Sequence, residues 1–245
     1  MITLRRDEER HRDRRGKHDA WQTFHPGDRN DAPTGGFGPL EMVNEDRLPP
    51  GASLSHGLPL EADIVTYVLD GALAQEDASG RLVVLQAGEF QRLTAGRGVR
   101  HTETNASLVD WAHVFQVWLC PSEVGLAVSR EQKRFSAAER RGRLCVVASP
   151  DGRRGSLRVH QDALLYSAVL DPGQHVVHEL SRGRSAWLHL IGGVATLGDV
   201  VLTSGDGVGL SEERAVSFTA REQSEVLLID LWAPARSSDQ SWLLR

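Results

Sequence analysis

The residues with the clearest chemistry in this 245-residue sequence are His101 and Glu103, which lie two positions apart. In an extended strand, residues two apart point to the same face, so this imidazole and this carboxylate can converge on one point. Such a pair suits a divalent transition metal, and two histidines with one carboxylate suit non-haem iron. The sequence therefore predicts a candidate metal site at His101 and Glu103, and Glu103 is also a candidate catalytic base.

Two other interpretations of this pair remain open. His101 and Glu103 could form a structural ion pair across an empty cavity. Alternatively, either side chain could act as an acid or a base in a site that uses no metal. A measurement of metal content distinguishes the predicted metal site from both alternatives.

The segments around the pair have the pattern of short β-strands. We expect strands at residues 40–44, 63–69, 81–85 and 111–119, punctuated by glycine-containing turns at Gly71, Gly80 and Gly88. Further strands are expected at residues 144–148, 164–170, 186–191, 194–197 and 226–231. Long helical periodicity is missing from the sequence, so the predicted fold is all-β, with sandwiches or barrels.

The chain divides into two similar β-rich halves. We expect an N-terminal domain at residues 1–120, a basic linker with a short helix at 121–143, a C-terminal domain at 144–233 and a tail at 234–245. Ile2–Leu4 could dock as an edge strand. The second half has His175 and His178 spaced i, i+3, which does not place both on one strand face, so we expect no metal there.

Composition excludes several classes of protein. The net charge of −5 argues against a protein that binds nucleic acid by neutralising phosphates. The first residues lack the apolar core of a secretory signal, and no run approaches the ~20 apolar residues of a membrane helix. Cys120 and Cys145 do not form a CxxC motif, and we expect two reduced thiols. A cytoplasmic protein without a membrane partner is expected.

Two motifs resemble those of cupins. Gly96-x-Gly98-x2-His101-x3-Asn105 follows the second half of the second cupin motif, with glycine where proline usually stands. Together with the Trp21-Gln-Thr-Phe24 entry segment and Ser156-Leu-Arg-Val-His160, the chain resembles the pirin family of two-domain cupins. The resemblance implies two tandem jelly-roll barrels, with a metal held only in the N-terminal one.

The resemblance also implies four metal ligands, of which this sequence keeps half. The second pair falls on His101 and Glu103, whereas the first pair falls on Gly57 and Pro59, which offer no side-chain ligand. His56 lies one position earlier. In a regular strand this offset reverses the face, although a bulge can re-aim a side chain. We therefore retain His56 as the third candidate ligand beside His101 and Glu103.

The family suggests two functions of different classes. The first is a quercetin 2,3-dioxygenase that binds a flavonol-like ligand, with iron as the expected metal and nickel, zinc or copper as alternatives. The second is a bicupin without metal that regulates other proteins or binds small molecules. With two histidines replaced, the sequence predicts an impaired metal site.

Overall fold

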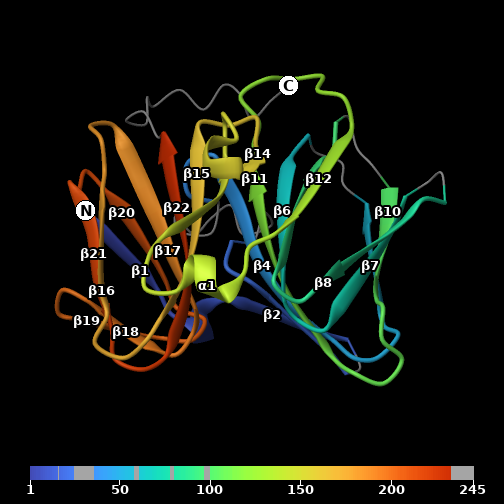
Figure 1. Cartoon of the computed structure of the whole chain (residues 1–245), viewed down its shortest axis with the longest axis horizontal. Helices are drawn as coiled ribbons and strands as arrows, with labels where there is room; N and C mark the ends of the chain where they lie inside the picture. The colour runs from blue at the N-terminus through green and yellow to red at the C-terminus, as the bar shows by residue number, and fades with distance from the viewer. Residues whose placement is uncertain (16, 25–35, 58–60, 78–79, 97–99, 233–245) are drawn as a thin grey trace.

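The computed structural model describes residues 1–15, 17–24, 36–57, 61–77, 80–96 and 100–232, with only the backbone described at residues 15, 54–57, 100 and 101. These residues form two β-barrels that lie side by side (Figure 1). Each barrel consists of one seven-stranded sheet and one four-stranded sheet. The expected all-β fold with two tandem cupin barrels is confirmed.

The N-terminal barrel has the strand orders β12-β9-β6-β11-β4-β3-β2 and β5-β10-β7-β8. Its strands are β2 (His11–Arg15), β3 (His18–Gln22), β4 (Leu40–Leu48), β5 (Ser53–Gly57), β6 (Asp63–Asp70), β7 (Ala72–Asp77), β8 (Leu82–Gln86), β9 (Glu89–Thr94), β10 (Arg100–Asn105), β11 (Ala112–Leu119) and β12 (Ser129–Arg134).

The C-terminal barrel has the orders β1-β20-β17-β22-β15-β13-β14 and β16-β21-β18-β19. Its strands are β1 (Ile2–Arg5), β13 (Cys145–Ser149), β14 (Leu157–Arg158), β15 (Ala163–Leu170), β16 (His175–Glu179), β17 (Arg184–Gly192), β18 (Val194–Leu197), β19 (Val200–Thr203), β20 (Gly207–Ser211), β21 (Ala215–Ala220) and β22 (Ser224–Trp232). Two 3-10 turns, η1 (Asp7–Glu9) and η2 (Arg153–Gly155), and the helix α1 (Ala137–Arg140) complete the described structure.

The two seven-stranded sheets are buried on both faces. In β6, Val65 and Tyr67 join a hydrophobic cluster shared with the C-terminal sheet, whereas Ile64 and Val68 belong to clusters inside the N-terminal barrel. In Figure 1 the central strands of the two sheets accordingly lie against one another. Double-sided burial explains why these strands read as continuous apolar runs rather than as an alternating pattern.

Two segments do not follow the expected domain boundaries. β1 pairs with β20, so Ile2–Arg5 belongs to the C-terminal sheet although the sequence assigned it to the N-terminal domain. β12 pairs with β9 and is the edge of the N-terminal sheet, although residues 129–134 fall within the expected linker. The docking of Ile2–Leu4 as an edge strand and the short helix in the linker are confirmed.

Arg140 of α1 connects the two barrels through one buried guanidinium. Its Nη1 donates to the hydroxyl of Tyr67 at 3.1 Å, to Ser167 at 3.0 Å, and to the carboxylate of Glu225. The Tyr67 hydroxyl also donates to Glu225 at 2.6 Å, and the Tyr67 ring stacks on Phe90 at 4.1 Å. Because Tyr67 and Phe90 belong to one barrel and Ser167 and Glu225 to the other, this network fixes their relative position.

A second polar group lies at the junction and contains a fully buried histidine. His189 of β17 is 0% exposed, and neither of its ring nitrogens has a hydrogen-bond partner among the described residues. Burial, reinforced by the charge of Arg10, lowers the pKa of His189 to about 3. Burial alone raises the pKa of the neighbouring Glu45, but hydrogen bonds from His113 and Arg10 and their charges outweigh it and bring that pKa to about 2.

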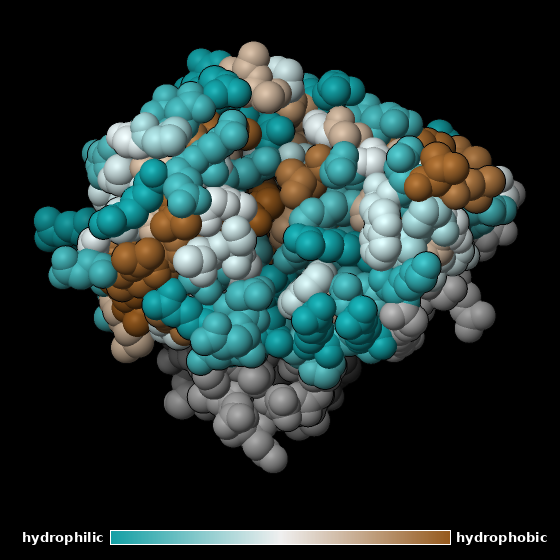
Figure 2. All heavy atoms as spheres, turned by 90° about the horizontal axis from the view of Figure 1, so that it is seen from below, coloured by the Kyte–Doolittle hydropathy of each residue, from teal (hydrophilic) through white to brown (hydrophobic). Residues whose placement is uncertain are grey.

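The exposed apolar side chains are dispersed over the described surface. Figure 2 shows a mainly hydrophilic face with separate apolar areas. Leu108 and Val109 are among the most exposed of these side chains, and small exposed patches are normal for a folded domain. In the described part of the chain, no helix has the length and apolarity needed to span a bilayer.

We predict that Arg140→Met destabilises the protein by about 3 kcal/mol, because it leaves the Glu225 carboxylate without its buried cationic partner. The measurement is the free energy of unfolding in urea. Arg141→Met is the matched control, since the pair between Arg141 and Asp171 is exposed and should contribute less than about 1 kcal/mol. Equal losses in the two variants would contradict a special role for Arg140.

We also predict that His189 makes the fold acid-sensitive between pH 6.5 and 4.5. In this range the unfolded chain binds a proton at this ring that the folded chain excludes, so acidification favours unfolding, by about 2 kcal/mol at most across the window. The pKa of Glu45 is lowered from 4.5 to about 2, so the stability that this carboxylate contributes is lost only below this pH range. The free energy of unfolding of His189→Leu should therefore depend less on pH than that of the unmodified protein; parallel profiles would refute this.

Candidate functional site

Glu103 is held inside the N-terminal barrel by two glutamine side chains. Its carboxylate is 1% exposed and accepts hydrogen bonds from Gln75 Nε2 at 2.6 Å and from Gln116 Nε2 at 3.0 and 2.8 Å. Trp118 Nε1 donates to Gln116 Oε1 at 3.4 Å, which turns the amide nitrogen of Gln116 toward Glu103. Amide N–H groups only donate, so this arrangement supports an ionised carboxylate at a fixed position.

The strand register explains how these side chains meet. Gln75 on β7 lies directly opposite Glu103 on β10, within the four-stranded sheet. Gln116 belongs to β11, in the seven-stranded sheet across the barrel interior. The carboxylate therefore joins the two sheets of the barrel through hydrogen bonds.

A row of polar side chains crosses the inner face of the seven-stranded sheet at the level of Gln116. Gln116 is paired in register with Asn44 and Thr66, Thr66 with Gln91, and Gln91 with Gln132. Gln91 is 0% exposed, and neither polar atom of its side chain has a hydrogen-bond partner among the described residues. An unsatisfied buried amide costs about 1–3 kcal/mol. The Gln91 amide is therefore available to form hydrogen bonds with a bound ligand.

The backbone places both candidate histidines next to this carboxylate in register. His101 is paired with His56 on β5 and with Asp77 on β7, and Glu103 follows two positions later on β10. Directly opposed positions of an antiparallel pair belong to one face of the sheet. The positions of His56, His101, Asp77 and Glu103 thus share the inner face, although the side chains of the two histidines lie outside the described part.

The donor types at these positions fit a transition metal. Two imidazoles and one or two carboxylates are a suitable ligand set for iron or nickel. Among the side chains that the structure describes, no three histidine, cysteine, aspartate or glutamate groups converge as a metal site. The side chains of His56 and His101 lie outside the described part, so their role as ligands stays a prediction, as does the role of Glu103.

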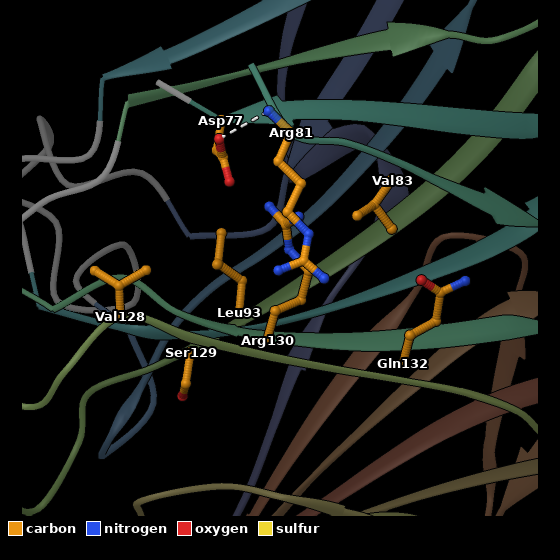
Figure 3. A pocket seen from close by; sticks show the side chains of 8 residues that line it. All are labelled: Asp77, Arg81, Val83, Leu93, Val128, Ser129, Arg130 and Gln132. Atoms are coloured by element: carbon orange, nitrogen blue, oxygen red, sulfur yellow. Dashed lines mark hydrogen bonds between the residues drawn. The ribbon is translucent and has the colours of Figure 1, made fainter. Parts of the chain in front are cut away.

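A cavity of about 380 Å³ opens beside this site (Figure 3). It lies between the edges of the two sheets, and its lining comes from β7, β8, β9, β12 and the residues next to them: Asp77, Arg81, Val83, Leu93, Val128, Ser129, Arg130 and Gln132. Asp77 lies on the same face of β7 as Gln75, the partner of Glu103. The cavity therefore leads toward the polar interior of the barrel.

Two other carboxylates near the first motif are engaged elsewhere. Asp63 is 0% exposed and accepts a hydrogen bond from Thr94 Oγ1 at 2.6 Å, and its Oδ2 also accepts from the backbone N–H of His160. Glu61 accepts from the backbone N–H of Gly125 at 2.9 Å. Asp63 thus ties the N-terminal barrel to the loop before β15.

His175 and His178 of the C-terminal half are also paired with other groups. His178 Nε2 lies 2.8 Å from Asp230 Oδ2, and His175 Nδ1 lies 2.8 Å from Thr219 Oγ1. His175 Nε2 also lies 3.3 Å from Ser217 Oγ, so both histidines are engaged by polar side chains of other strands.

Sequence reasoning did not identify Gln75, Gln91, Gln116, Asp77 or Arg130 as members of this site. A signal was present, because Thr66 and Gln116 interrupt strands that are otherwise largely apolar. A polar residue at an inward position of a strand is a candidate for ligand or carboxylate binding.

Comparison with known proteins agrees with this architecture. The Pirin family model matches residues 5–119, and the model described as the quercetinase C-terminal cupin domain matches residues 146–231. A quercetin 2,3-dioxygenase of Escherichia coli is 37% identical over 231 residues, covering 94% of this chain and 99% of the relative. A pirin-like protein of Caulobacter vibrioides is 31% identical over 195 residues, covering 79% and 84%.

Among solved structures, the fold is similar to that of bacterial pirin YhhW from Escherichia coli in complex with nickel(II). The two share 36% sequence identity with a TM-score of 0.86, covering 96% of this chain and all of the other. Similarity on this scale extends over both barrels and their relative placement. The chain belongs to the pirin family of two-domain cupins.

Proposed function

We propose that this protein is a metal-dependent dioxygenase of the quercetin 2,3-dioxygenase type, acting on a flavonol-like substrate in the N-terminal barrel. The observation that carries the proposal is the buried Glu103 carboxylate, held by Gln75 and Gln116 on the face that the positions of His101 and His56 share. The name of the Escherichia coli relative and the nickel(II) in the YhhW structure support the same chemistry.

In this proposal His101, Glu103 and His56 hold the metal. Iron is the expected ion, and nickel, zinc and copper are alternatives. When bound, the metal supplies a Lewis acid that orients the substrate oxygens and favours the deprotonated hydroxyl. The loss of ligands at Gly57 and Pro59 would then be offset by His56 rather than leave the site impaired.

The residues of this chain position the substrate and move one proton. Glu103 accepts the hydroxyl proton of the flavonol, and the amides of Gln75 and Gln116 keep its carboxylate in place for that transfer. The cavity beside Asp77 receives the rest of the substrate, and the apolar side chains of Val83 and Leu93 contact its rings. Burial of Glu103 keeps bulk water away from the reacting hydroxyl.

The direct test is metal content and flavonol oxygenation. We expect close to one metal ion per chain by mass spectrometry after anaerobic loading with Fe(II) or Ni(II), together with oxygen uptake on addition of quercetin. His101→Ala should lose most of the metal and the activity. Thermal unfolding checks that this variant stays folded.

No metal in either protein would overturn the proposal. A shift of the melting temperature by a small molecule in metal-free protein would then favour a binding protein that works without metal. Metal binding without oxygen uptake would retain the site and reject the dioxygenase.

We further predict that Gln116→Leu weakens metal binding about 10- to 100-fold, because groups that hydrogen-bond a ligating carboxylate tune its affinity by this amount. The measurement is a competition titration against a chelator. Gln86→Leu, at an exposed position at the end of β8, is the matched control and should bind as the unmodified protein does. Equal affinities in all three proteins would mean that Gln116 does not position Glu103.

A further inference from the structure

The cavity beside the candidate metal site contains two arginine side chains without an acidic partner among the described residues. Arg81 precedes β8 and Arg130 lies on β12, and Figure 3 shows their guanidinium groups next to one another in the cavity. Neither guanidinium has a hydrogen bond or an ion pair with another described residue, and the buried Nε of Arg130 has no partner. Two adjacent cations without an intervening anion repel one another, so a bound anion would stabilise this arrangement.

The other charged groups around Arg130 can be named. Burial lowers the pKa of Arg130, the charge of Arg81 lowers it further, and Asp77 and Glu103 raise it. Asp77 has its own role in the turn, where its Oδ1 accepts the backbone N–H of Arg81 at 3.2 Å. Among the charged residues that line the cavity, two arginines and one aspartate leave a single positive charge for a ligand.

We propose that this cavity binds a compact oxyanion of the substrate, such as a carboxylate or a sulfate, between Arg81 and Arg130. The planar guanidinium forks match such groups with paired hydrogen bonds. The physiological substrate is then an anionic aromatic compound rather than a neutral flavonol. This inference rests on the proposed function for the aromatic part of the ligand, and on the arginine pair for the charge.

The geometry separates the two ends of such a ligand. Arg130 is paired in register with Leu93 on β9, whereas Glu103 lies on β10 of the other sheet. Arg81 directly precedes β8, the edge of the four-stranded sheet, so the oxyanion binds between the edges of the two sheets, and the reacting hydroxyl binds farther inside, toward β10. Val83 and Leu93 line the space on the arginine side.

The test compares two anionic ligands with a neutral analogue of similar shape, using the full chain without metal. The probes are 3-hydroxyflavone-4′-carboxylic acid, its methyl ester and the corresponding 4′-sulfate, with Kd measured by calorimetry. We expect either anion to bind at least 10-fold more tightly than the ester, and this preference to weaken as salt rises. Similar affinities for all three probes would overturn the proposal.

Variants test whether the preference for anionic ligands depends on the two arginines. Arg130→Met and Arg81→Met should each remove most of the preference for the anion, while Arg134→Met, an exposed arginine of the same strand outside the cavity, should keep it. A preference that persists in the double variant would overturn the assignment. Melting temperatures confirm that each variant is folded.

The outcomes distinguish this inference from the proposed function. Anion-selective binding without oxygenation of any probe would reject the dioxygenase and retain the oxyanion site. Oxygenation with the same kcat/KM for the acid and its ester, unchanged in Arg130→Met, would retain the dioxygenase and reject the oxyanion site.

Discussion

Burial of both faces of the two seven-stranded sheets is the constraint on which the rest of this structure depends. Each sheet must fill its own barrel with one face and pack against the other sheet with the opposite face. Apolar residues on both faces satisfy most of this requirement and leave few places for polar groups. Those that remain, such as Arg140 and Glu103, are therefore held by several hydrogen bonds.

The same constraint explains the different interiors of the two barrels. The interior of the C-terminal barrel is a continuous cluster of apolar side chains from both of its sheets, with Phe218 and Leu188 among them. In the N-terminal barrel, the corresponding space divides into two smaller apolar clusters. The row from Asn44 to Gln132 and the Glu103 carboxylate supply polar groups in this barrel. A ligand that brings its own charge can bind there, whereas the other interior would have to expel packed side chains.

Much of the fold could be predicted from local sequence because strand content depends on local pattern. The expected strands at residues 63–69 and 111–119 correspond to β6 and β11. Sheet membership was less predictable, since it depends on partners far along the chain: β1 pairs with β20, and Asp63 binds a backbone N–H 97 residues away. The site could be predicted only in part for the same reason. Glu103 is part of a recognisable motif, whereas Gln75 and Gln116 contact it only because of strand register and closure of the barrel.

The position of His56 illustrates how register decides what a motif can mean. Counting from the first motif places candidate ligands at residues 57 and 59, and a shift of one residue reverses the face of a regular strand. Pairing gives a different criterion, because the position opposite His101 belongs to the face of His101 whatever its place in a motif. In this structure that position is His56. A barrel without side-chain ligands at residues 57 and 59 can thus still have a second histidine position on the face of the first, because the pairing of β5 with β10 brings His56 opposite His101.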